Sequence, residues 1–445
     1  MTVTIVGSQL GDEGKGALVD LWGGDADIVV RYQGGDNAGH TVVEDGQEYK
    51  LSLVPSGAVR DKVGVLGNGC VINPRTLFSE IDDLRERGLE PDVRLAKRAH
   101  VIMPYHRRLD NIEEEAKADS DEDLVVGTTG RGIGPTYEDK AGRRGIRVGD
   151  LLDPDVLRQR LEYVVPQKKA LIEDVYGLEA GEECDVEALV EEYTEFGRRL
   201  RKDDMAVNCG DFLAERREAG ENVMFEGAQG TLIDIDHGSY PYVTSSNPTA
   251  GGAATGSGVG PTVVGQGEVV GIVKAYLSRV GEGPMPTELK NDERDEELAD
   301  FIREKGGEFG TVTGRPRRIG WLDMPMLRHA ARVSGFTGIA VNHLDVLAGL
   351  DEIKVGHAYE LEGEERLTMP ATTERWAECE PVLKEFETWP EVDWTEVAEE
   401  GADAIPDAAQ DYLDYISDEL GVPIYAVGVG PDRAQTVHLA NPFDQ

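Results

Sequence analysis

Residues 3–22 read VTIVGSQLGDEGKGALVDLW, and this stretch decides the predicted fold. The β-branched run Val3–Gly7 is typical of a buried strand and ends in a glycine-rich loop. Apolar residues then recur with helical spacing over residues 17–22. A second strand is expected over residues 27–32, before another glycine-rich loop at residues 33–40. A strand, a helix and a strand joined by such loops predict a parallel sheet.

Outward from this stretch, further strands are expected over residues 222–225, 268–275, 338–341 and 422–427. Helical segments are expected at residues 105–117 and about 153–220. We therefore expect the α/β class and a P-loop-NTPase-like fold. One large domain should span residues 1–445, with a mostly parallel central sheet, helices on both faces and a helical insertion at about 153–220. Ligands of open α/β sheets bind at the carboxyl ends of the strands, so the site is expected there.

The chain of 445 residues carries 86 acidic and 45 basic side chains, a net charge of −41. Such a charge disfavours nucleic acid and anionic lipid as partners. The sequence has no apolar run long enough for a membrane span and no recognisable signal peptide, so we expect a cytoplasmic protein. The acidity predicts a surface adapted to high salt, and an ordinary acidic protein is the alternative. The four cysteines are far apart and predict free thiols.

The first loop, residues 7–16, has the features of a phosphate-binding loop, with glycines, a helix start and Lys15. It departs from the Walker pattern, because Gln9 stands where glycine is usual and Gly16 where a hydroxyl is usual. A carboxylate beside a phosphate is repulsive unless it binds a metal or accepts a proton. Asp12 is therefore predicted to be a metal ligand, a general base or both, and a solvated acidic turn is the alternative.

The second and third glycine-rich stretches also carry polar side chains that suit anion chemistry. In residues 34–41, His40 could donate a proton or hydrogen bond to a developing negative charge, although a lone His is more often structural. Residues 127–135, followed by Arg143 and Arg144, suit a second phosphate site. A mobile loop with incidental arginines is the alternative for that stretch.

Two later stretches complete the set of candidate loops. Residues 314–318 hold three arginines, a basic island that predicts an anionic ligand, with a solvated charged face as the alternative. Residues 342–345, Asn-His-Leu-Asp, resemble a guanine-specificity element in which Asp accepts hydrogen bonds that adenine cannot donate. Alone, this tetrapeptide is more simply explained by an Asp that caps a helix.

Taken in order along the whole chain, these motifs resemble the adenylosuccinate synthetase family. The resemblance rests on GDEGKG (11–16), VVRYQGGDNAGHT (29–41), GTTGRGIGPTYEDKAGRRGIRVGDL (127–151), FEGAQGTLIDIDHGSYPYVTSSNPTAGGAATGSGVGP (225–261), RVGEGPMPTEL (279–289), GRPRRIGWLD (314–323), HLDVL (343–347) and GPDR (430–433).

The resemblance implies a GTP-dependent ligase that joins IMP and L-aspartate into adenylosuccinate, with GDP and phosphate released, through a 6-phosphoryl-IMP intermediate. This is the first committed step of AMP synthesis from IMP. The implied catalytic residues are Asp12, which takes the N1 proton of IMP, and His40, which stabilises charge and donates a proton. One Mg²⁺ per subunit is implied at Asp12 and the Gly39 carbonyl. Arg143 is implied to reach the IMP of a neighbouring subunit, which predicts a homodimer.

The resemblance also implies three sets of binding residues, with a nucleotide-base-binding part at about residues 338–445. The GTP set is Gly11, Asp12, Glu13, Gly14, Lys15, Gly16, His40, Thr41, Arg317, His343, Leu344, Asp345, Gly428, Val429 and Gly430. The IMP set is Asp12, Lys15, Asn37, Ala38, Gly39, His40, Thr129, Arg143, Gln229, Thr244 and Arg315. The aspartate set is Thr311, Val312, Thr313, Gly314, Arg315 and Arg317.

The chain departs from the family pattern at Asp36, where many relatives have His, at Pro316, at His343 in place of Lys, and at Gly428-Val429 in place of Ser-Thr. The departures at His343 and Gly428-Val429 affect the predicted guanine contacts and leave Asp12, His40 and Lys15 in place. Two other functions stay open at this point. One is a regulatory GTP-binding switch, and the other is a related ligase that uses another amino acid or ATP.

Overall fold

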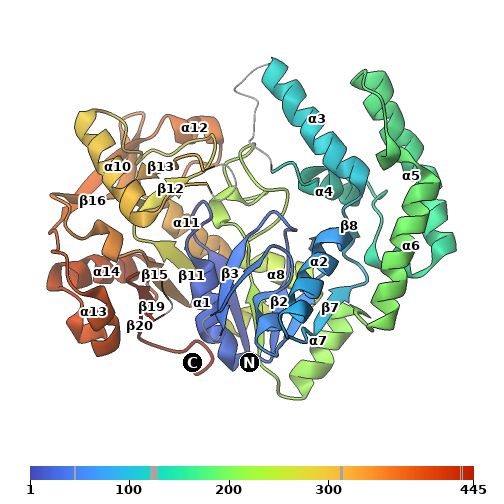
Figure 1. Cartoon of the computed structure of the whole chain (residues 1–445). Coiled ribbons are helices and arrows are strands. Elements are labelled where there is room, and N and C mark those ends of the chain that lie inside the picture. Colours follow the sequence, from blue (N-terminus) through green and yellow to red (C-terminus); the bar gives the residue numbers. More distant parts are fainter. Residues whose placement is uncertain (45–46, 121–128, 311–313, 431, 433) are drawn as a thin grey trace.

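The computed structural model describes residues 1–44, 47–120, 129–310, 314–430, 432 and 434–445, without the side chains of residues 40, 41, 43, 44 and 118–120. Its centre is a ten-stranded sheet (Figure 1). From edge to edge the strands are β20 (Thr436–His438), β19 (Ile424–Gly428), β15 (Gly338–Asn342), β11 (Glu268–Lys274), β1 (Thr2–Gly7), β10 (Val223–Glu226), β2 (Ile28–Arg31), β5 (Val63–Leu66), β7 (Val93–Ala96) and β9 (Ala206–Val207).

All neighbouring strands of this sheet are parallel except β19 and β20. The mostly parallel sheet predicted from the sequence is therefore confirmed. The strands predicted at residues 3–7, 27–32, 222–225, 268–275, 338–341 and 422–427 are present within two residues of their expected ends. β1 and β2 are separated by β10, which pairs with both, so the chain returns some 200 residues later to fill the gap between them.

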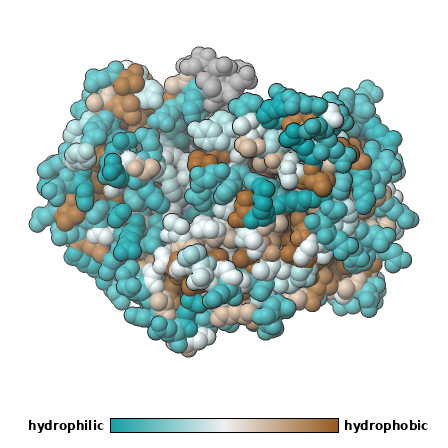
Figure 2. Space-filling view, turned by 180° about the vertical axis from the view of Figure 1, so that it is seen from behind, coloured by the Kyte–Doolittle hydropathy of each residue, from teal (hydrophilic) through white to brown (hydrophobic). Residues whose placement is uncertain are grey.

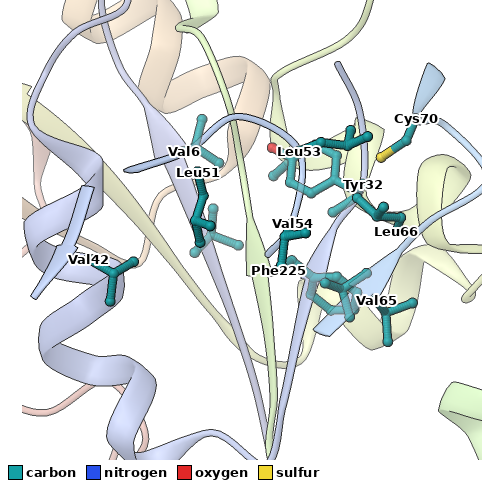
Figure 3. Packing of buried hydrophobic residues seen from close by; sticks show 14 of the residues in the cluster. Val6, Tyr32, Val42, Leu51, Leu53, Val54, Val65, Leu66, Cys70 and Phe225 are labelled. Atoms are coloured by element: carbon teal, nitrogen blue, oxygen red, sulfur yellow. The ribbon is translucent and has the colours of Figure 1, made fainter. Parts of the chain in front are cut away.

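Alternating side chains of the central strands enter two different hydrophobic clusters. In β1, Val6 belongs to the larger cluster, whereas Val3 and Ile5 belong to the smaller one. Successive side chains of a strand point to opposite faces, so the two clusters lie on the two faces of the sheet. Figure 3 shows part of the larger cluster, where Val6 lies near Leu51, and Phe225 lies near Val54 and Val65.

Helices cover both faces, as expected. Helix α1 (Lys15–Trp22) packs into the smaller cluster and α2 (Pro74–Glu86) into the larger one. The other helices are α3 (Pro104–Ser120), α4 (Ile133–Ala141), α5 (Pro154–Ala170), α6 (Val186–Lys202), α7 (Cys209–Glu218), α8 (Ala250–Ser257), α9 (Pro261–Gly265), α10 (Glu293–Gly306), α11 (Met324–Ser334), α12 (Thr373–Ala377), α13 (Trp394–Glu400) and α14 (Asp407–Leu420).

Shorter sheets flank the central one. The pairs are β3 (His40–Glu44) with β4 (Gln47–Leu51), β6 (Val71–Ile72) with β8 (His100–Val101), and β12 (Leu277–Arg279) with β13 (Arg318–Gly320). A further sheet contains β14 (Leu322–Asp323), β16 (Ile353–Leu361), β17 (Glu364–Arg366) and β18 (Glu380–Phe386). The predicted helix at 105–117 is α3, and the predicted helical stretch at 153–220 contains α5, α6 and α7 along one side of the molecule (Figure 1).

The glycine-rich stretch at residues 249–261 packs tightly against other backbone, as its composition predicted. It contains α8, and a Cβ atom on Gly256 would lie 2.0 Å from the Tyr32 carbonyl oxygen. Gly69 makes a similar approach, because its amide donates to the Gly256 carbonyl at 2.9 Å. Glycine is therefore required here by close contact between the helix and the central sheet.

The outside of the molecule is largely hydrophilic, with scattered hydrophobic side chains on the face shown in Figure 2. Within the described residues, no helix combines the length and the apolar character that crossing a membrane requires. The four cysteines are free thiols, which confirms that expectation.

Asp323, the N-terminal cap of α11, gives the fold a pH dependence. Burial raises the pKa of its carboxyl to about 7, although Tyr359 Oη (2.7 Å) and the Met326 amide (3.1 Å) donate to it. Between about pH 4 and 7 the folded chain therefore keeps a proton that the unfolded chain releases. The free energy of unfolding should fall as pH rises through this window, by up to roughly 4 kcal/mol.

Asp323→Asn should remove this contribution, because an amide cannot ionise. The measurement is denaturant unfolding at pH 5 and pH 8 in the same concentration of KCl, for the wild type and the variant. Asp292→Asn is the control, because Asp292 caps α10 in the same way but is exposed. An unchanged pH dependence in Asp323→Asn would contradict the assignment.

Candidate active site

The loop after β1 turns sharply, so that α1 begins close to the carboxyl end of this central strand. Gly11, Asp12 and Gly14 have φ angles of 92°, 57° and 80°, in the left-handed region. Gly14 is the N-terminal cap of α1, and Lys15 is the first helical residue. The predicted phosphate-binding loop thus lies at the carboxyl end of a central strand, with a helix N-terminus behind it.

Glu13 fills part of this loop with its own carboxylate. The side chain is fully buried, and Oε1 accepts hydrogen bonds from the amides of Gln9 (3.0 Å) and Gly11 (2.9 Å). Oε2 forms an ion pair with Lys15 Nζ at 2.6 Å. Glu13 therefore occupies the cation and two of the amides that an incoming phosphate would use, an arrangement that the sequence did not predict.

Asp12 lies beside the arginine-rich segment, residues 314–318, so the structure brings this segment next to the phosphate-binding loop, residues 7–16. Its carboxylate, 56% exposed, forms an ion pair with Arg317 Nη2 at 2.8 Å. The other edge of the guanidinium, Nη1, contacts Glu308 Oε2 at 2.6 Å. Burial lowers the pKa of Arg317, but the charges of Asp12 and Glu308 outweigh it and the net pKa is raised. Arg317 is thus a fixed cation at the mouth of the phosphate loop.

Behind Arg317, Glu308 is buried among polar partners that the sequence analysis missed. Lys274 Nζ and Tyr276 Oη contact its Oε1 at 2.6 and 2.7 Å. Burial raises the pKa of Glu308, but Lys274, Tyr276 and Arg317 outweigh it and hold the pKa at about 2. Lys274 could have been predicted, because it is a charged residue that directly follows the uncharged run 269–273.

The ends of β15 and β19 place the segment of residues 342–345 next to the phosphate-binding loop. Asn342 Nδ2 donates to the Glu13 carbonyl at 2.7 Å, and a Cβ on Gly14 or on Gly428 would collide with the Asn342 amide group. His343 has a φ of 63°, and burial lowers the pKa of its ring to about 4, so it is neutral. Its ring meets Tyr276 edge-on at 6.0 Å.

Asp345 lies two residues after His343, at the start of a short helical turn. One oxygen of its carboxylate accepts no hydrogen bond in the described residues. Its Oδ1 is buried and has no hydrogen-bond partner in the described residues, and burial raises the pKa of the carboxyl. The backbone of the adjacent strand closes this side: the Leu344 amide donates to the Gly428 carbonyl at 3.2 Å, and Val429 is buried. An orphaned carboxylate oxygen is the group that a ligand with N–H donors would satisfy.

The glycine-rich loop at residues 33–40 lies against the residues that follow β10. Gln229 has a φ of 59°, and its buried Oε1 has no hydrogen-bond partner in the part of the chain that is described. A Cβ on Gly34 would lie 3.3 Å from this oxygen, so the amide faces this loop. Asn37 Oδ1 accepts from the Gly35 amide at 3.2 Å, and Gly39 is exposed. His40 and Thr41 begin β3, and their side chains lie outside the description.

Thr129 and Arg143 flank α4, which lies well to the right of β12 and β13 in Figure 1. The segment between them contacts the loop at residues 33–40, because the Gly34 amide donates to Tyr137 Oη at 2.9 Å. Both are exposed, and Arg143 has a φ of 61°. No hydrogen bond or ion pair in the described residues joins either of them to Asp12, Arg317 or Asp345. Of the remaining predicted residues, Thr244 is half-buried, Ala38 follows Asn37, Gly314 and Arg315 are exposed, and Thr311, Val312 and Thr313 lie outside the described residues.

An ion cluster around the buried Asp139 fixes helix α4, which ends two residues before Arg143. Asp139 on α4 pairs with Lys168 of α5 at 2.6 Å and with Arg144 at 2.7 Å, and it contacts the His106 ring of α3 at 2.9 Å. Burial lowers the pKa of His106, so the ring is neutral at pH 7. The end of α4 is thereby anchored to two other helices just before Arg143.

Across the described residues, no three His, Cys, Asp or Glu side chains form a metal cage. Asp12 nevertheless fits Mg²⁺, which commonly binds through one or two carboxylates together with substrate phosphates. The Asp12 carboxylate is half-exposed at the phosphate loop and the Gly39 backbone is exposed, so both could supply oxygen ligands.

Comparisons with known proteins agree on one family. The family model of adenylosuccinate synthetase matches residues 4–437. The adenylosuccinate synthetases of Natronomonas pharaonis and Haloarcula marismortui are 71% and 68% identical to this chain over 460 aligned residues, covering all of both chains in each case. The fully ligated adenylosuccinate synthetase of Plasmodium falciparum is 36% identical, with a TM-score of 0.88 over 98% of this chain and 99% of that one. The first two organisms are halophilic archaea, which supports the salt-adapted surface expected from the charge.

Proposed function

Because this chain belongs to the adenylosuccinate synthetase family, we propose that it joins IMP and L-aspartate into adenylosuccinate at the expense of GTP. GDP and phosphate are the other products, and 6-phosphoryl-IMP is the intermediate. The observation that carries the proposal is the contact between Asp12, in the phosphate loop, and Arg317, in the arginine-rich segment. A candidate base, a phosphate site and a carboxylate-binding cation meet at one point.

In the first step Asp12 takes the N1 proton of IMP, and O6 attacks the γ-phosphorus of GTP. The O6–P bond forms while the bond from phosphorus to the β,γ-bridging oxygen breaks, which releases GDP. Asp12 must first part from Arg317, and Lys15 must part from Glu13 to bind the phosphates. His40 stabilises the charge that develops during phosphoryl transfer with a hydrogen bond and donates a proton during this step.

In the second step the amine of aspartate attacks C6, and phosphate leaves with O6. The carboxylates of aspartate bind to the segment from Thr311 to Arg317, where Arg315 and Arg317 supply the positive charge. Arg317 is already placed beside Asp12, so the amino acid would be held next to the reacting base. This is positioning catalysis, in which the reactants are held in a productive geometry.

Asp12 and the Gly39 carbonyl would hold one Mg²⁺ per subunit. Such an ion would neutralise charge on the phosphates of GTP.

The guanine and IMP sites are proposed from atoms that lack partners. Asp345 Oδ1 would accept from guanine, with His343 and Leu344 beside it and the backbone of Gly428 to Gly430 behind the base. Gln229 Oε1 would accept from IMP. The IMP phosphate and ribose would bind Asn37, Ala38, Thr129, Thr244, Arg143 and Arg315.

Arg143 is exposed and makes no ion pair with Asp12 in the described residues, which supports a homodimer in which Arg143 completes the neighbouring site. Arg143→Leu and Lys15→Ala chains should each be nearly inactive alone. Mixed dimers then contain one intact site in two, and an equal mixture should recover about a quarter of wild-type activity. The measurement is turnover after dissociation and reassociation, and each variant reassociated with itself is the control. A mixture no more active than its components would contradict shared sites.

The proposed function is tested by incubating the protein in high KCl with IMP, GTP, Mg²⁺ and each amino acid in turn. Adenylosuccinate should form with aspartate, and the formation should require both GTP and IMP. Absence of product with aspartate would contradict the proposal. Hydrolysis of GTP without IMP would favour a nucleotide switch, and product formed with ATP alone would overturn the guanine assignment.

A further inference from the structure

Glu308 connects the end of β11 to the arginine-rich segment through a continuous row of short polar contacts. Lys274 Nζ contacts Glu308 Oε1 at 2.6 Å, Glu308 Oε2 contacts Arg317 Nη1 at 2.6 Å, and Arg317 Nη2 contacts Asp12 at 2.8 Å. Lys274 and Glu308 are almost completely buried, whereas Arg317 is partly exposed. The row therefore runs from the core of the sheet to the surface of the site.

Two carboxylates hold the guanidinium of Arg317, one at each edge, and they differ in burial. Glu308 is buried and further fixed by Tyr276 Oη at 2.7 Å, so it cannot follow a ligand. Asp12 is 56% exposed on a turn, so this contact can be exchanged for a ligand anion. An ion pair with a charged, buried partner is stronger and more rigid than one with an exposed partner.

From this asymmetry we infer that Glu308 is a positioning residue for Arg317. It anchors the Nη1 edge so that the Nη2 edge stays directed at the place where Asp12 and an incoming carboxylate compete. Lys274 keeps Glu308 ionised and in place, and it is joined to Ser278 Oγ at 2.6 Å. The inference rests on the proposed function, because the anion that replaces Asp12 is taken to be the aspartate substrate.

Two variants separate positioning from simple structural support. Glu308→Gln keeps the shape and an acceptor for Tyr276 but removes the charge that binds Arg317. Because it leaves Lys274 buried without a counter-ion, a second variant, Lys274→Met with Glu308→Gln, removes both charges. Glu288→Gln is the matched control, since Glu288 pairs in the same way with the next arginine, Arg318, at 2.6 Å and makes no contact with Arg317 in the described residues.

In steady-state kinetics the Glu308 substitutions should act on the KM for aspartate rather than on kcat. Both Glu308 variants should raise the KM for aspartate about tenfold, a loss of about 1.4 kcal/mol of binding, with the KM for IMP unchanged. A structural role alone would reduce the amount of active enzyme, and so kcat, without changing the KM for aspartate. That result, or an equal rise of KM in Glu288→Gln, would overturn the inference.

Crystal structures of ligand-free Glu308→Gln and wild-type protein give a readout that does not depend on the reaction. Arg317 Nη2 should leave Asp12 in the variant, and a contact preserved near 2.8 Å would overturn the inference. A wild-type protein that formed no adenylosuccinate would refute the proposed function, and the placement of Arg317 would still be tested.

Discussion

Replacing Asp12 by Asn should lower kcat by about 10²- to 10⁴-fold while leaving the affinity for IMP largely intact. Asn keeps the size of the side chain and tolerates the left-handed φ of 57° at this position. It cannot accept the N1 proton, so O6 of IMP stays a poor nucleophile. The ion pair to Arg317 is also lost, but Asp12 is 56% exposed and the effect on stability should be small.

The measurements are turnover under saturating substrates and IMP binding by calorimetry. Asp61→Asn is a matched control, because Asp61 is an exposed aspartate with a φ of 55° outside the predicted site residues. The control should keep wild-type turnover. If Asp12→Asn retained more than a tenth of the wild-type kcat, Asp12 could not be the base.

Replacing Asp345 by Asn should raise the KM for GTP by roughly 10- to 100-fold. The carboxylate accepts from guanine N1–H and the exocyclic amine, whereas an amide presents its own N–H donors to that edge. Xanthine carries a carbonyl in place of the amine, so XTP should become the better phosphoryl donor for the variant. The buried Oδ1 without a partner is the structural basis of this expectation.

The measurement compares kcat/KM for GTP, XTP and ATP in the wild type and the variant. Asp351→Asn serves as the control, since Asp351 is exposed and outside the predicted base-binding residues. A variant with unchanged preference for GTP would show that Asp345 does not read the base.

The sequence predicted the parts of the fold in which one residue pattern suffices. Val3–Gly7 has only apolar and β-branched residues before its glycine, and it forms a fully buried strand. The short strands β5, β7 and β9 were not predicted, because two to four residues of this kind fit a strand or a turn equally well. The insertion of β10 between β1 and β2 depends on pairing over some 200 residues, which local patterns do not contain.

The candidate site was predictable as separate loops and less so as an arrangement. Asp12 was predictable as a functional residue because a carboxylate beside a phosphate is repulsive unless it binds a metal or accepts a proton. The structure adds its contact with Arg317. The masking of Lys15 by Glu13 was not predictable, since it depends on how the loop folds back on itself. Glu308 was missed because an acidic residue in a chain with 86 of them gives no signal until its burial is known.

The central claim is that O6 of IMP attacks the γ-phosphate of GTP before aspartate enters. It is tested most directly with IMP that carries ¹⁸O at O6, incubated with GTP, Mg²⁺ and aspartate, followed by mass spectrometry of the released phosphate. The account predicts that the phosphate formed with adenylosuccinate carries the ¹⁸O atom. Unlabelled phosphate released together with adenylosuccinate would contradict it.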